Sequence, residues 1–353
     1  MTSAPSFHNP KKGTRPFIIP IFIPHAGCPH QCAFCNQTHI ADRPEDIPSG
    51  KNIAAEIVRF LRYQQAHHEA PQISFYGGTF LGIGEKRILK LLGVATRFVS
   101  RGQAASIRFS TRPDTITPAI MDLIHGFPVR TIELGVQSMD NTVLKRSQRG
   151  HTALDTHRAV ALLKEHGYDI GLQMMIGLPS QDESSTMSTA HEIAALRPDA
   201  VRIYPTIILK NSHLEAWYRG GVYEPLSLDG AVAQTKRLYT FFNDKQIPVI
   251  RMGLQASESL GFDKAIVAGP YHPAFGHLVL SAVFLEKTEY LLGQLEPGTE
   301  QLILRIHPRN ESRLRGLQNS NIKRLKERFC LKKISVLPDS RLSMETVKID
   351  SRL

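Results

Sequence analysis

The sequence predicts an α/β protein built as a partial or complete (β/α) barrel, followed by a small C-terminal α/β extension. Short apolar runs rich in β-branched residues alternate with longer amphipathic stretches through most of the chain. Alternation at this spacing indicates parallel strands covered by helices. Six or seven such repeats fit a barrel better than a flat doubly wound sheet, and no G-x-G-x-x-G or Walker sequence supports a nucleotide-binding alternative.

The elements follow in order along the chain. The predicted strands are residues 17–23, 72–76, 106–110, 131–136, 170–176, 200–204 and 248–252. The predicted helices are residues 52–66, 85–99, 153–166, 186–196 and 228–243. We therefore expect a flexible tail over 1–16, the barrel over 17–260 and the extension over 261–353.

Composition places the chain among ordinary globular proteins, with 42% hydrophobic and 21% charged residues. No apolar run approaches the roughly 20 residues that a membrane span requires. Residues 1–16 lack the apolar centre of a secretory signal. We expect a cytoplasmic protein, in a reducing compartment, with no membrane association.

Three cysteines, Cys28, Cys32 and Cys35, follow the first predicted strand with C-x3-C-x2-C spacing. Cubane iron–sulfur clusters are usually held by four cysteines. The remaining cysteine, Cys330, lies far along the chain, so a dedicated fourth thiolate is not expected. Three thiolates would leave one iron open to bind and activate another molecule.

Zinc is the alternative at this loop. His25, His30 or His39 could complete a tetrahedral site with three cysteines and one histidine. Disulfides fit poorly, because the clustered cysteines are odd in number and the expected compartment is reducing. Spacing alone leaves zinc and an open iron–sulfur cluster as candidates.

Polar or glycine-rich segments end several predicted strands. Gly77 and Gly78 follow the second strand, residues 111–114 follow the third, Gln137 ends the fourth, and residues 177–179 follow the fifth. In a barrel, functional residues gather at the carboxyl ends of strands. We expect these segments and the cysteine loop to form one shared site.

The cysteine loop, with the aromatic Phe34 before its last cysteine and the Gly77-Gly78 pair after strand two, resembles that of radical SAM enzymes. The resemblance implies a barrel of the radical SAM type and a 4Fe–4S cluster on Cys28, Cys32 and Cys35. S-adenosylmethionine (SAM) would chelate the open iron. One electron, from a flavodoxin- or ferredoxin-class reductant, would split it and form a 5′-deoxyadenosyl radical that abstracts hydrogen from substrate.

The same resemblance implies a set of SAM-binding residues. Gly77 and Gly78 would let backbone approach the amino group, Arg149 would pair with the carboxylate, and Ser110 would contact the ribose. Thr79 stands where many relatives have an acidic residue. The full set is Phe34, Gly77, Gly78, Thr79, Ser110, Arg112, Gln137, Arg149, Gln173 and Met175.

A narrower resemblance is to the radical half of the Elongator catalytic subunit. It rests on Ser110-Thr-Arg-Pro-Asp114, Glu133-Leu-Gly-Val-Gln-Ser138, Met175-Ile-Gly-Leu-Pro179 and Trp217-Tyr-Arg-Gly-Gly-Val-Tyr-Glu-Pro-Leu226. That family modifies the wobble uridine of transfer RNA, with an acetyl group supplied by a second domain, so tRNA is the implied partner. The residues after the barrel are too few for that domain and lack its acyl-CoA loop, so acetyl transfer is not expected.

The C-terminal extension is basic. Residues 301–353 hold 13 Lys or Arg and 5 Asp or Glu, a balance expected either of nucleic-acid binding or of a solvated basic surface. Their β-α-turn-α-β order resembles a KH domain, which clamps single-stranded backbone with a G-x-x-G loop. Asn319 replaces the second glycine and tolerates left-handed geometry. The resemblance implies RNA contacts from Arg315, Gly316, Lys323 and Arg324, and a packing module is the alternative.

Three functions remain open on the sequence. The predicted one is a radical SAM enzyme that modifies RNA. The second is a radical SAM enzyme for a small molecule or tetrapyrrole, although Gln37 stands where oxygen-independent coproporphyrinogen oxidase has a further cysteine. The third is a non-catalytic, metal-binding RNA-binding protein. His272 and His277 are candidates for an acid or base or for loop packing.

Overall fold

The computed structural model describes residues 17–23, 27–36, 47–63, 70–255, 260–262, 264–295 and 299–350. These residues form two compact units. The first unit consists of the described residues up to 135, except residues 30–36, and of residues 158–170. The second holds residues 30–36, 136–157 and those from 171 onward. The predicted tail over 1–16 lies outside the described residues, and the predicted domain boundaries stay predictions.

The main sheet has seven strands in the order β1-β2-β3-β4-β5-β6-β8. The strands are β1 (Ile18–Ile23), β2 (Gln72–Gly77), β3 (Ser106–Thr111), β4 (Val129–Gln137), β5 (Asp169–Ile176), β6 (Ala200–Pro205) and β8 (Val249–Met252). The ladders β1–β2, β2–β3, β3–β4, β5–β6 and β6–β8 are all parallel. All seven predicted strands are confirmed, and the fold is a partial (β/α) barrel.

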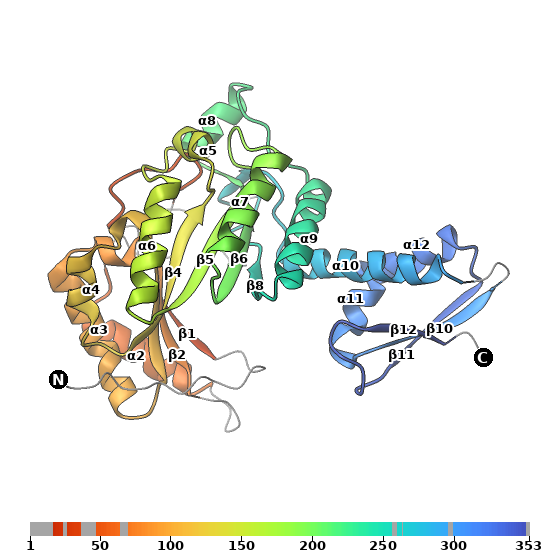
Figure 1. Ribbon diagram of the computed structural model, residues 1–353, viewed down its shortest axis with the longest axis horizontal. Coiled ribbons are helices and arrows are strands. Elements are labelled where there is room, and N and C mark those ends of the chain that lie inside the picture. Colours follow the sequence, from red (N-terminus) through yellow and green to blue (C-terminus); the bar gives the residue numbers. More distant parts are fainter. Residues whose placement is uncertain are drawn as a thin grey trace. The chain divides into compact units, whose positions relative to one another are not determined.

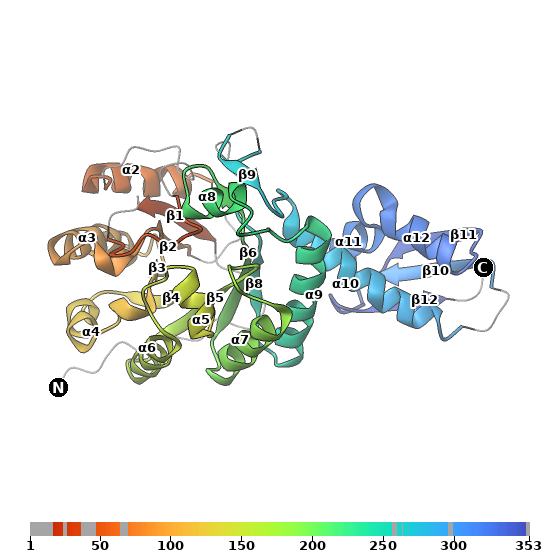
Figure 2. The same cartoon turned by 90° about the horizontal axis from the view of Figure 1, so that it is seen from above.

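Helices lie on the outer side of the strands of each unit (Figures 1 and 2). In the first unit these are α2 (Gly50–Leu61), α3 (Glu85–Ser100) and α4 (Pro118–Ile124). In the second they include α7 (Glu183–Ala195) and α9 (Leu228–Asp244), while α6 (Ala153–Glu165) has residues in both units. Short turns η1 (Phe80–Gly82) and η2 (Pro113–Thr115) follow β2 and β3.

Strand side chains and a stacked aromatic row build the core of the first unit. Ile73, Phe75 and Phe109 are fully buried. Phe80 of η1 stacks between Phe75 and Phe109, with ring centroids 4.9 Å and 4.8 Å apart. Burying each such side chain contributes about 1.5–3 kcal/mol. The stack therefore fixes the loop after β2, which carries Gly77 to Thr79.

Short helices follow the strands of the second unit. They are α5 (Asn141–Arg146) and α8 (His213–Arg219), and a two-stranded antiparallel pair joins β7 (Ile208–Leu209) to β9 (Ile266–Ala268). Asp140 begins α5, because its carboxylate accepts from the backbone N–H groups of Thr142 and Val143. The sequence did not predict α4, α5 or α8, whose few turns carry too little periodicity.

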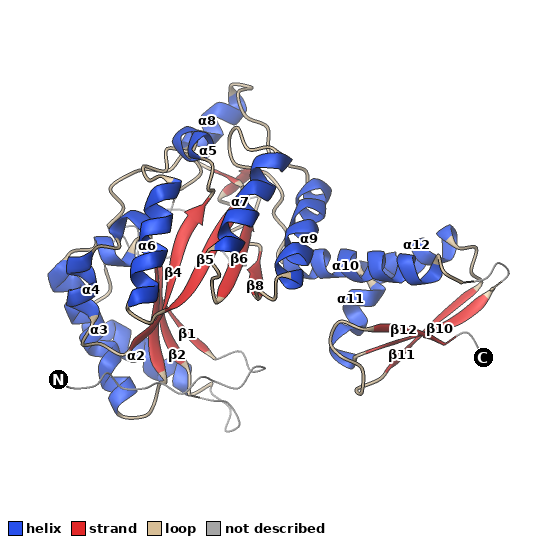
Figure 3. Cartoon of the chain, viewed as in Figure 1, coloured by secondary structure: helices blue, strands red, loops and turns tan. Residues whose placement is uncertain are grey.

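The C-terminal module begins with the long helix α10 (Phe275–Leu292), which packs against α9. It continues with β10 (Gln301–Ile306), η3 (Pro308–Asn310), α11 (Glu311–Arg315), η4 (Leu317–Asn319), α12 (Ser320–Arg328), β11 (Lys333–Pro338) and β12 (Val347–Asp350) (Figure 3). Central β10 pairs parallel with β11 and antiparallel with β12. The predicted β-α-turn-α-β order is confirmed, and α10 and β12 are additions.

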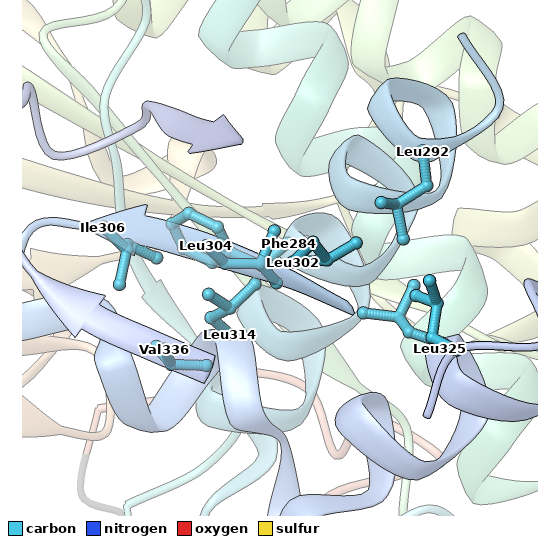
Figure 4. Close-up of a cluster of buried hydrophobic side chains, with 9 residues drawn as sticks. Phe284, Leu292, Leu302, Leu304, Ile306, Leu314, Leu325 and Val336 are labelled. Atoms are coloured by element: carbon cyan, nitrogen blue, oxygen red, sulfur yellow. The ribbon is translucent and has the colours of Figure 1, made fainter. Parts of the chain in front are cut away.

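One apolar cluster holds this module together (Figure 4). Leu304 of β10 and Leu314 of α11 are fully buried in it, with Phe284 of α10 and Leu325 of α12. A buried amide adds to the packing, because Asn321 Nδ2 donates to the carbonyls of Ser281 and Leu314 at 2.9 Å and 3.1 Å. None of the described helices is long and apolar enough to span a bilayer.

Candidate functional site

The cysteine loop follows β1, and its first thiol lies against the loop after β2. Cys28 Sγ is 2.9 Å from Thr79 Oγ1, and either atom can be the donor. Thr79 is buried, so this contact is shielded from water. A hydroxyl that donates to sulfur stabilises negative charge there. The first predicted cluster ligand and a predicted SAM-binding residue are therefore in direct contact.

The second thiol lies beside a buried guanidinium. Arg149 Nη1 donates to Cys32 Sγ at 3.2 Å, and both residues are 6% exposed. Because arginine is always charged, it places a fixed positive charge next to the sulfur and favours the thiolate. The structure shows this contact for Arg149, and its pairing with the SAM carboxylate stays a prediction.

Backbone hydrogen bonds fix the loop between Cys32 and Cys35. Ala33, which is fully buried, donates its N–H to Ser147 O at 3.0 Å and accepts from Leu214 N at 2.8 Å. The neighbouring His30 ring lies against Gly150, where a Cβ atom would come closer than 3.0 Å to it. Gly150 also has a φ of 73°. Glycine is therefore required there, and the loop is held on both sides.

The glycines after β2 provide bare backbone, as predicted. Gly77 lies opposite Ile23 in the β1–β2 ladder and has a φ of 119°. The N–H of Gly78 donates to Ile23 O at 3.2 Å. Side chains are excluded from Gly77 because a Cβ atom would come closer than 3.0 Å to the Ile23 carbonyl oxygen. The absence of a side chain at Gly77 therefore allows the close approach of the β1 and β2 backbones, and the contact of Gly77 and Gly78 with the amino group of SAM stays a prediction.

Two predicted SAM-binding amides meet in the second unit. Gln173 Nε2 on β5 donates to Gln137 Oε1 at 3.2 Å. Gln137 ends β4 with a φ of 68°, in the left-handed region, and its side chain is buried. A non-glycine residue in that region costs of order 1–3 kcal/mol, and such strain clusters at functional sites.

Phe34 and Met175 are also brought together. Both belong to an apolar cluster with Val143, Leu178 and Tyr204. Met175 is 8% exposed, and Phe34 is half-buried. The aromatic residue before the last cysteine thus packs against the carboxyl end of β5.

Tyr223 restrains the loop that follows β5. Its hydroxyl donates to Gly177 O at 2.6 Å. Burial raises the pKa of Tyr223, so the phenol stays protonated and remains a donor. The side chain of Leu226 lies on the same glycine, 3.0 Å from where its Cβ would be. Segment 223–226 therefore positions the loop that carries Gly177.

Ser110 and Arg112 contact carboxylates of their own unit. Ser110 Oγ donates to Glu133 Oε2 at 3.1 Å, and Glu133 also forms a buried ion pair with Arg108. Arg112 makes a bidentate pair with Asp114, with Nε and Nη2 each 2.9 Å from a carboxylate oxygen. Arg112 thereby holds its own turn, and the SAM contacts of Ser110 and Arg112 stay predictions.

The candidate histidines have local partners. His272 Nδ1 accepts from Ala274 N at 3.0 Å, and His277 Nδ1 lies 3.4 Å from Ser281 Oγ. Partial burial lowers the pKa of His277, which favours its neutral form. These contacts support the loop-packing interpretation. His25 and His39, the other zinc candidates, lie outside the described residues.

The donor set fits a 4Fe–4S cluster. Cys28, Cys32 and Cys35 form no disulfide, and Cys330 is exposed in the C-terminal module. A hydroxyl and a guanidinium stabilise negative sulfur at Cys28 and Cys32, as an anionic cluster requires. A cubane offers a different iron to each thiolate. Within the described ranges, no three His, Cys, Asp or Glu side chains gather as they would around a metal ion.

Comparison with known proteins identifies the family. Residues 22–193 match the radical SAM superfamily, and residues 198–283 match the Radical_SAM C-terminal domain. The chain belongs to the radical SAM superfamily and is an enzyme. Members of this superfamily use a 4Fe–4S cluster and SAM, so these are the cofactors of this protein. Neither family match extends to the β-α-α-β part of the C-terminal module.

Individual relatives agree with this assignment. The chain is 31% identical to a tRNA uridine(34) acetyltransferase of Dehalococcoides mccartyi over 134 residues, covering 36% of this chain and 29% of that protein. It is 26% identical to Protein YhcC of Escherichia coli over 202 residues, covering 54% and 60%. The archaeal Elp3 structure from Methanocaldococcus infernus shares the fold, with a TM-score of 0.61, 19% identity and coverage of 78% and 64%. The chain thus spans less than two thirds of the length of each of these three proteins.

Sequence reasoning missed two residues of this region. Glu133 has a visible signal, because it is an acid between the apolar residues Ile132 and Leu134 of a predicted strand, and the structure places it beside Ser110. Tyr223 has no such signal, since its role depends on the distant Gly177 carbonyl.

Proposed function

We propose that this enzyme modifies a base of transfer RNA by radical chemistry. The observation that carries the proposal is the three-cysteine loop, in which Thr79 and Arg149 contact the sulfurs of Cys28 and Cys32. The RNA part is supported by the name of the relative, a tRNA uridine(34) acetyltransferase. It is also supported by the basic C-terminal module. The group transferred is not part of the proposal.

Each residue has a physical role in this scheme. Cys28, Cys32 and Cys35 would hold three irons, and Arg149 would balance the charge of the sulfurs. Held by these cysteines, a reduced cluster would supply the one electron with which SAM is cleaved to methionine and a 5′-deoxyadenosyl radical, and this radical would abstract one hydrogen atom from the RNA. Gly77 and Gly78 would leave room for the amino group of SAM. A one-electron reductant of the flavodoxin or ferredoxin class would supply the electron.

We also propose that the loop before α12 and the outer face of α12 contact RNA phosphates. Gly316, Gln318 and Asn319 all have φ between 51° and 72°, and asparagine tolerates this left-handed geometry, which supports the comparison with a G-x-x-G loop. Lys323 is exposed and forms no ion pair among the described residues. Arg315 pairs with Glu311, while Arg324 shares Glu289 with Arg328. Lys323 is therefore the cation most available to a phosphate.

Anaerobic reconstitution tests the radical chemistry. With dithionite as reductant, the wild-type protein should bind about four irons and release 5′-deoxyadenosine from SAM. Cys35→Ser should lose both properties, whereas Cys330→Ser, the matched control, should keep them. A wild-type protein that binds iron yet releases no 5′-deoxyadenosine would contradict the proposal.

The RNA substrate is tested in cells and in solution. Nucleoside mass spectrometry should show one modified nucleoside missing from tRNA of cells that lack the protein. Binding of tRNA should weaken steeply with salt, and Lys323→Gln should flatten that dependence. An unchanged nucleoside profile together with no salt-sensitive binding would contradict the RNA substrate and indicate a small-molecule substrate instead. The cytoplasmic location stays a prediction.

A further inference from the structure

We propose that Trp217 and Arg146 form a platform on which an unpaired base of the RNA stacks. The inference rests on the proposed RNA substrate and states how the enzyme receives it. Arg146 ends α5 and Trp217 lies on α8, and both helices lie beyond the carboxyl ends of β5 and β6 of the same unit (Figure 1). This is the end of the barrel where functional residues gather.

The two side chains already stack on one another. The guanidinium carbon of Arg146 lies 4.9 Å from the centroid of the Trp217 ring. Arg146 is exposed and Trp217 is half-buried, so the pair forms part of the surface. Indole faces and arginine planes are the surfaces on which single-stranded bases stack. A base could stack on the outer face of the Arg146 guanidinium. It could also displace the guanidinium and stack on the Trp217 ring itself.

The segments that carry the pair also hold exposed apolar and basic side chains, which suit a base and its phosphates. Tyr218 is 38% exposed and Val222 is 61% exposed. Lys145 is exposed in the last turn of α5, and Arg219 is exposed although it pairs with Glu215. An aromatic surface flanked by cations complements single-stranded RNA. Paired bases offer no free face to such a surface, so the occupant is an unpaired base.

The platform is tied to the cysteine loop through a single residue. Ser147, directly after Arg146, accepts the N–H of Ala33 at 3.0 Å. Leu214, one helical turn before Trp217, donates to Ala33 O at 2.8 Å. Ala33 lies between two of the predicted cluster ligands. Both halves of the platform are therefore anchored to the loop that would hold the cluster.

A further hydrogen bond joins the two halves directly. His213 Nδ1, at the start of α8, lies 2.7 Å from Gln148 Oε1, in the turn after α5. The relative position of α5 and α8 is thus set by three separate hydrogen bonds. A base that stacks on this pair would be held at a fixed place relative to the cysteine loop, as hydrogen abstraction from one atom requires.

The chain provides its own probe, because Trp217 is its only tryptophan. Reconstituted holoenzyme with SAM is titrated with a fluorescently labelled RNA hairpin that has an unpaired loop. Label anisotropy reports binding, and tryptophan emission reports the platform alone. We expect Trp217 emission to be quenched with the same midpoint as the anisotropy change. A fully paired duplex of equal length should bind more weakly and leave the emission unchanged.

Variants measure the contribution of the stack. Trp217→Ala should raise the Kd for the hairpin by about 5-fold to 150-fold, the range of base–aromatic stacking. Trp217→Phe should retain most of the affinity, and Arg146→Gln should lose part of it. Tyr63→Ala removes an aromatic side chain that is 71% exposed on the first unit and should change nothing. RNA-independent SAM cleavage should stay at the wild-type level in every variant.

The outcomes separate this inference from the function on which it rests. If the hairpin binds but the emission is unchanged and Trp217→Ala and Arg146→Gln bind as the wild type does, the platform is wrong and the RNA substrate stands. If neither hairpin nor tRNA binds to an enzyme that cleaves SAM, the proposed substrate itself fails. Equal quenching by duplex and hairpin would show a charge-driven contact without stacking, which also overturns the platform.

Discussion

Gly77→Ala tests whether the close approach of two backbone segments shapes the SAM-binding edge of the sheet. Gly77 has a φ of 119°, a region that residues with a side chain rarely adopt. The added methyl group would come closer than 3.0 Å to the carbonyl oxygen of Ile23. That oxygen belongs to the paired strand and accepts from Gly78, so it cannot move without disturbing the end of the β1–β2 ladder.

The size of the effect follows from two terms. Backbone strain for a non-glycine residue in such a region costs of order 1–3 kcal/mol. Forcing an extra carbon into packed structure costs about 1–3 kcal/mol more. The sum, about 2–6 kcal/mol, is large against a typical net stability of about 5–15 kcal/mol. The variant should fold with reduced stability, and the disturbed end of the β1–β2 ladder should weaken the SAM binding that is predicted at this edge.

Urea unfolding followed by circular dichroism measures the first effect, and anaerobic SAM cleavage measures the second. Gly93→Ala is the matched control, since Gly93 lies within α3 and a Cβ there would meet nothing within 4 Å. The same chemical change should stabilise that helix by about 0.5–1 kcal/mol. If Gly77→Ala unfolds at or above the wild-type urea concentration, the argument from backbone approach is refuted.

Three further predictions concern other parts of the chain. Leu304→Ala removes a fully buried side chain and should cost the C-terminal module about 2–5 kcal/mol, seen as an earlier urea transition, whereas Leu317→Ala, at a site 52% exposed, should shift it little. Hydrogen bonds from Arg341 lower the pKa of Asp339 in the folded protein. These hydrogen bonds therefore contribute to stability above the ordinary pKa of aspartate, and that contribution is lost as the pH falls from there through the lowered pKa. Asp339→Asn should therefore lower the unfolding midpoint near neutral pH, with a difference from the wild type that closes in acid, and a pH-independent difference would contradict this. Tyr223→Phe removes the hydrogen bond that restrains the loop after β5 and should raise the KM for SAM several-fold at unchanged iron content. Equal KM values would show that the loop needs no such restraint.

The strands were predictable because their signal is local. Each of the seven is a short apolar run bounded by turn residues, and the structure confirms all of them within a few residues at each end. The cysteine pattern is local for the same reason, since the three predicted ligands lie within eight consecutive positions, and their binding of the cluster stays a prediction. Helix α10 was missed because it packs on several sides, against α9, α11 and α12. A helix that is apolar on most faces has no amphipathic period to detect.

The sequence by itself determined the sheet, the three-cysteine pattern and the family, because each depends on residue type and short spacing. Only the tertiary structure decided the partners of the charged and polar residues. Arg149 meets Cys32 across 117 positions of the chain, and Ser110 meets Glu133 through strand register. The platform of Arg146 and Trp217 likewise depends on how α5 and α8 are anchored to the cysteine loop. Contacts between distant residues depend on register and packing, which local patterns do not contain.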